Sequence, residues 1–179
     1  MLGVQYGMSA YGMGQKASLH VLEAEDLLQR HKDVYHTFWK WAERNVNAGL
    51  AGIELHTVFG WKIRAGKGRD VKENTFLNWP MQANGAEMLR LACIALEEEG
   101  IRICAPVHDA ILIEAPLNAI EDHVRHATSL MQKASEWVLG LGRQCRVDAE
   151  IVCCPDRYID GRGTDMWSFI QSRLGEEAA

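Results

Sequence analysis

The chain has 179 residues, of which 47% are hydrophobic and 24% are charged, and its formal net charge is −5. This length and composition are typical of a globular protein with one domain, or one domain and a subdomain. No stretch approaches roughly 18 consecutive apolar residues, and the N-terminus lacks the basic and apolar regions of a signal peptide. We therefore expect no membrane association and a cytoplasmic location.

The first part of the chain is predicted to be mainly helical. Glycines punctuate an apolar stretch at the N-terminus, so we expect the chain to begin inside a structural element. Over residues 22–48, apolar and aromatic side chains recur at three- and four-residue steps, which predicts a helix. Lys32-Asp33 predicts a break into two helices with Asp33 as the second N-cap, and Gly49 predicts the C-terminal end.

A short hairpin and a basic loop come next. Residues 53–57 and 61–64 flank Phe59-Gly60, which predicts two short antiparallel strands. The basic residues that follow are Lys62, Arg64, Lys67, Arg69 and Lys72. Such a loop is either simply solvated or contacts nucleic-acid phosphates. The acidic net charge of the whole chain argues against non-specific nucleic-acid binding, so only this local charge favours the second interpretation.

The second half of the chain mixes helices and strands. A helix is predicted over residues 80–99, with Pro80 near its start and Gly100 just past its end. Another is predicted over residues 117–139, and the alternation over residues 146–153 predicts a strand. The tail holds an amphipathic piece around Trp167. This order of elements predicts an α+β fold, in which helices cover one face of a small antiparallel sheet.

The most informative segment is residues 103–116, where two apolar runs flank the dipeptide His108-Asp109. Apolar runs of this length predict buried strands, so we expect a tight hairpin with an imidazole and a carboxylate at its apex. A carboxylate held there suits a divalent metal ion. Two alternatives stay open. An Asp at a turn commonly bonds its own backbone, and adjacent His-Asp pairs also occur, on helices, in one class of metal-dependent phosphohydrolases.

Two further segments are each weak signals on their own. Asn78 and Gln82 lie four residues apart and would share a helix face. Amides of this kind suit contacts in a minor groove, whose acceptors nearly coincide between base pairs, although a cap and a surface residue explain them equally well. Tyr6-Gly7 could stack on a base or sugar, or be a core tyrosine beside a helix-ending glycine.

Together, in this order and at these separations, the three segments resemble family A DNA polymerases, the group that includes bacterial DNA polymerase I and its phage relatives. Residues 3–12 (GVQYGMSAYG) resemble the end of motif B, residues 78–82 (NWPMQ) the Asn-x-Pro-x-Gln segment, and residues 107–109 (VHD) motif C. The resemblance covers nearly the whole chain, but only the C-terminal part of a family member. It implies a DNA-directed DNA polymerase, with a partial helical fingers segment at 1–50 and a palm portion at 51–179.

The resemblance also implies roles for the hairpin dipeptide. Asp109 takes the place of the motif C carboxylate that binds the catalytic Mg²⁺ ions, and His108 would lie near the primer terminus. In the two-metal scheme one ion activates the primer 3′-hydroxyl and the other holds the triphosphate and the leaving pyrophosphate.

The resemblance implies nucleic-acid and nucleotide contacts for the remaining segments. Tyr6 and Gly7 would lie by the nascent base pair, where the deoxynucleoside triphosphate binds. Asn78 and Gln82 would contact the primer-template duplex beside the active site, and the basic loop at 62–72 would lie toward the DNA backbone.

Three departures from the family pattern limit what the resemblance implies. Ala110 stands where the family usually has Glu, and Asn74 stands where it often has Arg. Motif A, with the second metal-binding Asp, and the motif B residues that grip the triphosphate would precede Met1. We therefore expect this polypeptide alone not to polymerise, and to need an upstream polymerase half that supplies motif A. A non-catalytic, prophage-derived DNA-binding remnant is the alternative.

Overall fold

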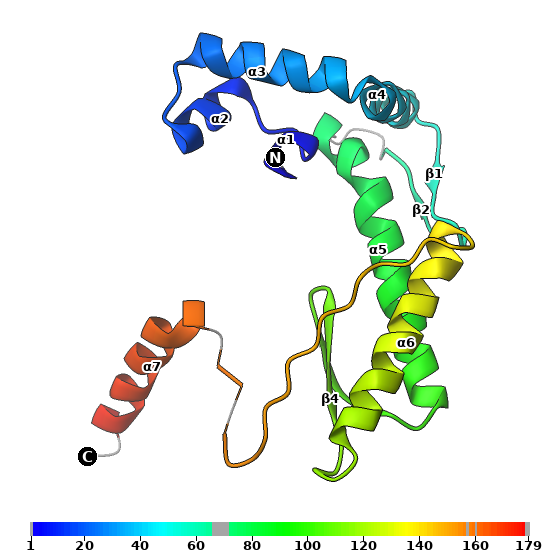
Figure 1. Cartoon of the computed structure of the whole chain (residues 1–179). Coiled ribbons are helices and arrows are strands. Elements are labelled where there is room, and N and C mark those ends of the chain that lie inside the picture. The colour runs from blue at the N-terminus through cyan, green and yellow to red at the C-terminus, as the bar shows by residue number, and fades with distance from the viewer. Residues whose placement is uncertain (1, 66–71, 157, 160, 178–179) are drawn as a thin grey trace.

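The computed structural model describes residues 2–65, 72–156, 158–159 and 161–177 and has an α+β fold (Figure 1). None of the helices in these ranges is long and apolar enough to cross a bilayer. In chain order the elements are α1 (Leu2–Gln5), α2 (Ala10–Ala17), α3 (Val21–Val34), α4 (His36–Leu50), β1 (Leu55–His56), β2 (Lys62–Ile63), α5 (Glu73–Glu98), β3 (Arg102–Val107), β4 (Ala110–Glu114), α6 (Ile120–Leu139), the 3₁₀ turn η1 (Gly161–Gly163) and α7 (Thr164–Glu177).

The core lies where α5, α6 and the β3–β4 hairpin pack together (Figure 1). Leu96 of α5 is fully buried, and Ile101 and Ala127 are nearly so. The side chains that pack against them are Ile103, Ile111, Ile113 and Leu130. Complete burial of a leucine side chain is worth about 1.5–3 kcal/mol, so this contact holds the hairpin against the two helices and fixes the position of its turn.

The predicted hairpin over residues 103–116 is confirmed, but the prediction that its strands are buried is wrong. No residue of β3 or β4 is buried, because only the face that carries Ile103, Ile111 and Ile113 packs on the core and the other face is exposed. β3 and β4 are antiparallel, and Val107 pairs with Ala110 beside the turn. The register shifts between Ile103 and Ala105, so Cys104 is an extra residue on β3. Such a bulge bends and twists the strand that carries it.

The predicted break between α3 and α4 exists, but its predicted position is wrong. The helix runs through Asp33, whose carboxylate accepts a hydrogen bond of 2.9 Å from the side chain of Gln29. Asp33 therefore caps nothing. The break falls at Tyr35, which leaves helical geometry with φ −101° and ψ 37°. The backbone N–H of Trp39 still bonds the Tyr35 carbonyl, so α4 begins directly after the break.

Gly49 is not the end of α4, because the helix continues to Leu50. Gly52, with φ +80°, follows the end instead. Gly49 serves a different purpose, since a Cβ there would overlap the ring of Phe76 on α5. Phe76 is fully buried. The absence of a side chain at position 49 therefore lets α4 approach α5 closely.

The prediction that α5 begins near Pro80 is also wrong, because α5 begins at Glu73 and Pro80 lies inside it. Proline inside a helix removes one backbone hydrogen bond and costs about 3 kcal/mol or more. Burial of Phe76 and Leu77 in the turn before Pro80 offsets that cost. The predicted end is confirmed, since Gly100 follows α5 with φ +70°.

The predicted strand over residues 146–153 is wrong, because the described chain forms only the β1–β2 and β3–β4 pairs. A strand needs a neighbour to bond its backbone N–H and C=O groups. The segment instead runs as an extended chain past α6 toward α7 (Figure 1). None of the described residues between 141 and 175 is buried. The expected single small sheet is therefore two separate hairpins.

Candidate functional site

Tyr6 is the C-cap of α1 and is followed by a glycine that the backbone requires. The N–H of Gly7 bonds the Val4 carbonyl at 3.0 Å, and that of Met8 bonds the Gly3 carbonyl at 2.9 Å. This pair of bonds ends a helix with a left-handed residue at the position after the cap. Gly7 has φ +84° there, a conformation that costs other residues free energy.

Three polar side chains of α5 hold this turn in place. Asn78 Nδ2 donates a hydrogen bond of 3.3 Å to the Tyr6 carbonyl, and Gln82 Nε2 donates one of 3.1 Å to the Tyr6 hydroxyl. A Cβ on Gly7 would overlap the side chain of Asn74. Positions 74, 78 and 82 recur every four residues, so their side chains lie on one face of the helix. We call these three side chains the amide stripe.

The amide stripe brings together two of the three segments that the sequence singled out. Tyr6, Gly7, Asn78 and Gln82 are all in contact or adjacent, although more than 70 residues separate the two segments. Sequence reasoning missed Asn74 as a member of this site. The four-residue spacing to Asn78 was the signal that could have found it.

His108 and Asp109 form the two-residue turn between β3 and β4. Both side chains are exposed. His108 has φ 55°, in the left-handed region that few residues other than glycine adopt. Backbone strain of this kind concentrates at functional sites. In the view of Figure 1 the hairpin lies on the same side of α5 as α1.

A buried polar cluster that the sequence did not reveal attaches the β1–β2 hairpin to α5. Thr57 Oγ1 donates a hydrogen bond of 2.7 Å to Glu87, and both residues are buried. Arg90 donates one of 2.7 Å to the other carboxylate oxygen of Glu87. Its guanidinium also lies over the Trp61 ring, 4.9 Å from the centroid. These contacts orient the segment in which the basic loop starts.

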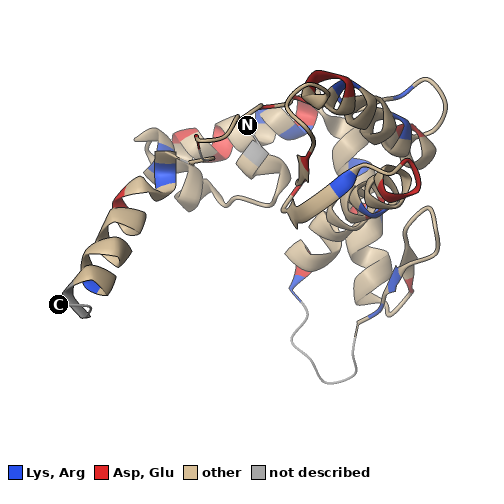
Figure 2. Ribbon diagram, turned by 90° about the horizontal axis from the view of Figure 1, so that it is seen from below, with Lys and Arg blue, Asp and Glu red and all other residues tan. Residues whose placement is uncertain are grey.

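The basic loop is described only at its two ends, and basic positions appear at both of them in Figure 2. Lys62 on β2 forms an ion pair of 3.2 Å with Glu54. Arg64 and Lys72 are exposed. Lys67 and Arg69 lie outside the described residues.

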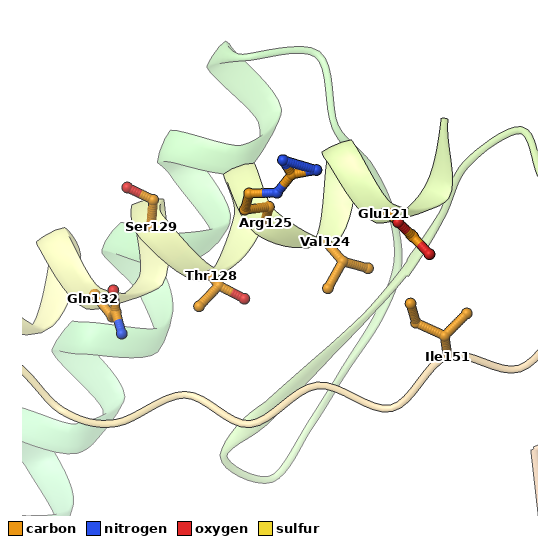
Figure 3. Close-up of a pocket in the computed structure, with 7 residues that line it drawn as sticks. All are labelled: Glu121, Val124, Arg125, Thr128, Ser129, Gln132 and Ile151. Atoms are coloured by element: carbon orange, nitrogen blue, oxygen red, sulfur yellow. The ribbon is translucent and has the colours of Figure 1, made fainter. Parts of the chain in front are cut away.

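One pocket adjoins the Tyr6 turn and the amide stripe, and another lies away from them. One of about 730 Å³ lies where the α1–α2 loop, α4 and α5 meet, and its lining includes Gly7 and Asn74 of the site together with Lys40 and Glu73. Figure 3 shows the other, of about 540 Å³, between α6 and the extended segment at Ile151. Of the predicted site residues that the structure describes, none lines this second pocket.

Comparison with protein families decides between the open interpretations. Residues 1–152 match the family model for DNA polymerase family A. The chain belongs to this family. The match contains all three segments on which the resemblance rested, and it ends before η1 and α7.

Curated relatives and a solved structure agree with the family A assignment. The thermostable DNA polymerase I of Thermus aquaticus is 29% identical over 141 residues, which are 73% of this chain and 17% of the relative. DNA polymerase I of Deinococcus radiodurans is 27% identical over 150 residues, 78% of this chain and 15% of the relative. The POL domain of Pol1 from M. smegmatis, in complex with DNA primer-template and dNTP, aligns with a TM-score of 0.62 and 25% identity over 74% of this chain and 26% of that chain. The chain thus spans less than a fifth of those curated relatives.

Family A membership implies the use of a divalent metal ion, and the described residues fit such a site only in part. Asp109 offers the hard oxygen ligand that Mg²⁺ prefers. Two catalytic ions about 3.5–4 Å apart need further carboxylates between them. No group of three or more His, Cys, Asp and Glu side chains gathers anywhere in the described part of the chain. These residues by themselves therefore do not form a two-ion site.

The hairpin also rules out the phosphohydrolase interpretation of His108-Asp109. That class carries its His-Asp pair on a helix, whereas here Val107 and Ala110 are paired strand residues on either side of the dipeptide. Membership of family A points the same way.

Proposed function

We propose that this chain forms the part of a template-directed DNA polymerase that contacts the primer-template and carries motif C. Residues 1–50 would belong to the fingers and residues 51–179 to the palm. The match of residues 1–152 to family A supports this proposal. So does the likeness to a polymerase domain whose structure contains DNA primer-template and dNTP. The substrates would be a primer-template duplex and deoxynucleoside triphosphates.

The single observation that carries the proposal is the contact between the Tyr6 turn and the amide stripe. The resemblance assigns Tyr6 and Gly7 to the nucleotide and Asn78 and Gln82 to the duplex. A polymerase site needs these groups side by side, since the incoming nucleotide stacks on the last base pair. The hydrogen bonds from Asn78 and Gln82 to Tyr6 bring these residues together within this chain, which supports the proposal.

Asp109 would supply one carboxylate of the metal site, and His108 beside it would face the primer terminus. Bound Mg²⁺ would neutralise charge on the triphosphate during transfer. Because the described residues do not complete that site, the second aspartate would come from an upstream polymerase half. Ala110 adds no acidic group beside Asp109. The 179-residue chain alone would therefore bind DNA without extending it.

DNA binding tests the first part of the proposal. The full chain should bind a fluorescent primer-template, measured by anisotropy at several salt concentrations. The double variant Asn78→Ala, Gln82→Ala should bind at least several-fold more weakly, because hydrogen bonds each contribute about 0.5–1.5 kcal/mol. The matched control Asn118→Ala, Gln171→Ala changes the same residue types at exposed positions elsewhere. Equal binding by the two double variants would contradict the proposal that Asn78 and Gln82 contact the duplex.

Primer extension tests the second part. With Mg²⁺ and all four deoxynucleoside triphosphates, the chain alone should give no extended product. Extension by the purified chain that Asp109→Ala abolishes would contradict the claim that a second carboxylate must come from outside it.

A non-catalytic DNA-binding remnant is the second candidate. The observation that favours it is that Asp109 is exposed and that no acidic cluster accompanies it among the residues the structure describes. Adding a separately expressed upstream portion of a family A polymerase separates the two. Extension that appears on mixing and depends on Asp109 supports a polymerase half. DNA binding without extension under these conditions supports the remnant.

A further inference from the structure

Gln82 of the amide stripe is already bonded to Tyr6. Duplex DNA would have to displace this bond to contact the amide of Gln82. Gln82 Nε2 donates to the Tyr6 hydroxyl at 3.1 Å, and both side chains are exposed. Tyr6 keeps 45% of its surface in solvent. The phenol oxygen therefore occupies one of the two N–H donors that Gln82 could present to a base edge, and it does so at an exposed position.

We propose that the Tyr6 hydroxyl is a stand-in for a minor-groove acceptor, so that the duplex and Tyr6 compete for the amide of Gln82. Purine N3 and pyrimidine O2 are the acceptors that a minor groove offers at every base pair. A phenol oxygen accepts a hydrogen bond in the same way. This inference rests on the proposed function, because it takes Gln82 to be a duplex contact.

The geometry allows the exchange without loss of the α1 turn. Asn78 donates to the backbone carbonyl of Tyr6, not to its side chain. The two bonds that end α1 join backbone atoms, and Asn74 packs against Gly7. All these contacts persist when the Tyr6 ring turns away from Gln82. The hydroxyl bond is thus the one contact of this set that a ring rotation breaks, and it is partly solvated.

Tyr6→Phe tests the competition, because it removes the hydroxyl and keeps the ring. The full-length variant should bind primer-template DNA more tightly than the parent chain, by roughly two- to tenfold, the effect of one hydrogen bond. Tyr11→Phe is a matched control, since the Tyr11 hydroxyl accepts a similar bond of 2.9 Å from Gln15 on α2. It should leave the affinity unchanged.

Two further experiments test whether the gain in affinity depends on Gln82 and on the minor-groove acceptors. In a Gln82→Ala background, Tyr6→Phe should have no effect on affinity. A duplex that carries 3-deazapurines lacks the N3 acceptors and keeps the pyrimidine O2 acceptors, so it should bind the parent chain more weakly and gain less from Tyr6→Phe.

The outcomes separate this inference from the proposed function. If Gln82→Ala weakens binding but Tyr6→Phe leaves it unchanged or weakens it, the competition is wrong and the duplex contact stands. If Gln82→Ala has no effect, or the chain binds no duplex, both the competition and the proposed duplex contact are wrong. Urea unfolding of Tyr6→Phe beside the parent chain shows whether the variant is folded. A gain in affinity that survives Gln82→Ala would also overturn the competition.

Discussion

Thr57 donates a hydrogen bond of 2.7 Å to Glu87 across 30 residues of sequence, and each of the two residues exposes only 5% of its surface. A buried carboxylate is tolerated only when its oxygens are paired. Here Thr57 takes one oxygen and Arg90 takes the other. This pairing explains why a hairpin with only four strand residues has a fixed position on α5.

Thr57→Val should therefore lower the free energy of unfolding by about 1–3 kcal/mol, because it leaves one buried oxygen of Glu87 without its donor. Urea denaturation measures the change. Thr75→Val, at an exposed position near the start of α5, is the control and should stay within about 0.5 kcal/mol of the parent. Equal effects of the two substitutions would mean that the bond does not hold the hairpin.

Gly7→Ala should destabilise the chain by about 1–3 kcal/mol. The residue has φ +84°, which alanine adopts only with strain, and its Cβ would meet Asn74. Gly85→Ala in the middle of α5 has open space around it and should stabilise the chain by about 0.5–1 kcal/mol. Opposite signs in thermal unfolding support the geometry of the α1 turn. A neutral Gly7→Ala would speak against it.

The sequence predicted the elements that local chemistry determines. The β3–β4 hairpin follows from two apolar runs around His108-Asp109, and the end of α5 follows from Gly100. Elements that depend on distant packing were misplaced. α5 extends upstream of Pro80 because Phe76 is buried against α4, and no local pattern reports that contact.

The strand predicted over residues 146–153 does not form, for a related reason. Alternation shows that a segment can form a strand, but pairing also needs a neighbouring strand with free backbone groups. The roles of the site residues stay predictions, and the contacts among them could not be predicted from the sequence. Tyr6, Asn78 and Gln82 were selected by residue type and order, yet nothing in the sequence showed that the two amides donate to Tyr6.

Glu136 should make the 140–144 turn sensitive to acid. The backbone N–H of Gly142 donates to its carboxylate at 2.6 Å and Gln144 donates at 2.9 Å. These bonds, with a smaller contribution from Lys133, lower the pKa of Glu136 below its ordinary value of 4.5. Because the pKa of Glu136 is lowered, the stabilisation from these two hydrogen bonds is complete above the ordinary pKa. It is lost as the pH falls through the folded-state pKa.

Hydrogen exchange at the Gly142 amide, measured from pH 7 downward, tests this. In the parent chain, protection should fall as the pH is lowered. In Glu136→Gln, protection should already be weaker at neutral pH and should change little with acid. Identical pH profiles for the two chains would exclude the charged carboxylate as the cause.

Lys62 and Arg64 should contribute to DNA affinity through phosphates. Replacing either residue with Gln should lower the slope of log affinity against log salt by about 1, without changing sequence preference. Arg125→Gln on α6, an exposed basic position outside the basic loop, is the control and should leave the slope unchanged. A slope that responds equally to all three changes would place the DNA elsewhere.

If this chain is the motif C part of a polymerase, the turn of the β3–β4 hairpin lies at the primer terminus. Photo-crosslinking tests it most directly. A primer whose 3′-terminal nucleotide carries a photoreactive group is annealed to a template, bound to the full chain and irradiated, and the crosslinked peptides are identified by mass spectrometry. We expect crosslinks concentrated in residues 102–114, around His108. Crosslinks that fall mainly on α7 or α3, or that do not depend on the template strand, would contradict it.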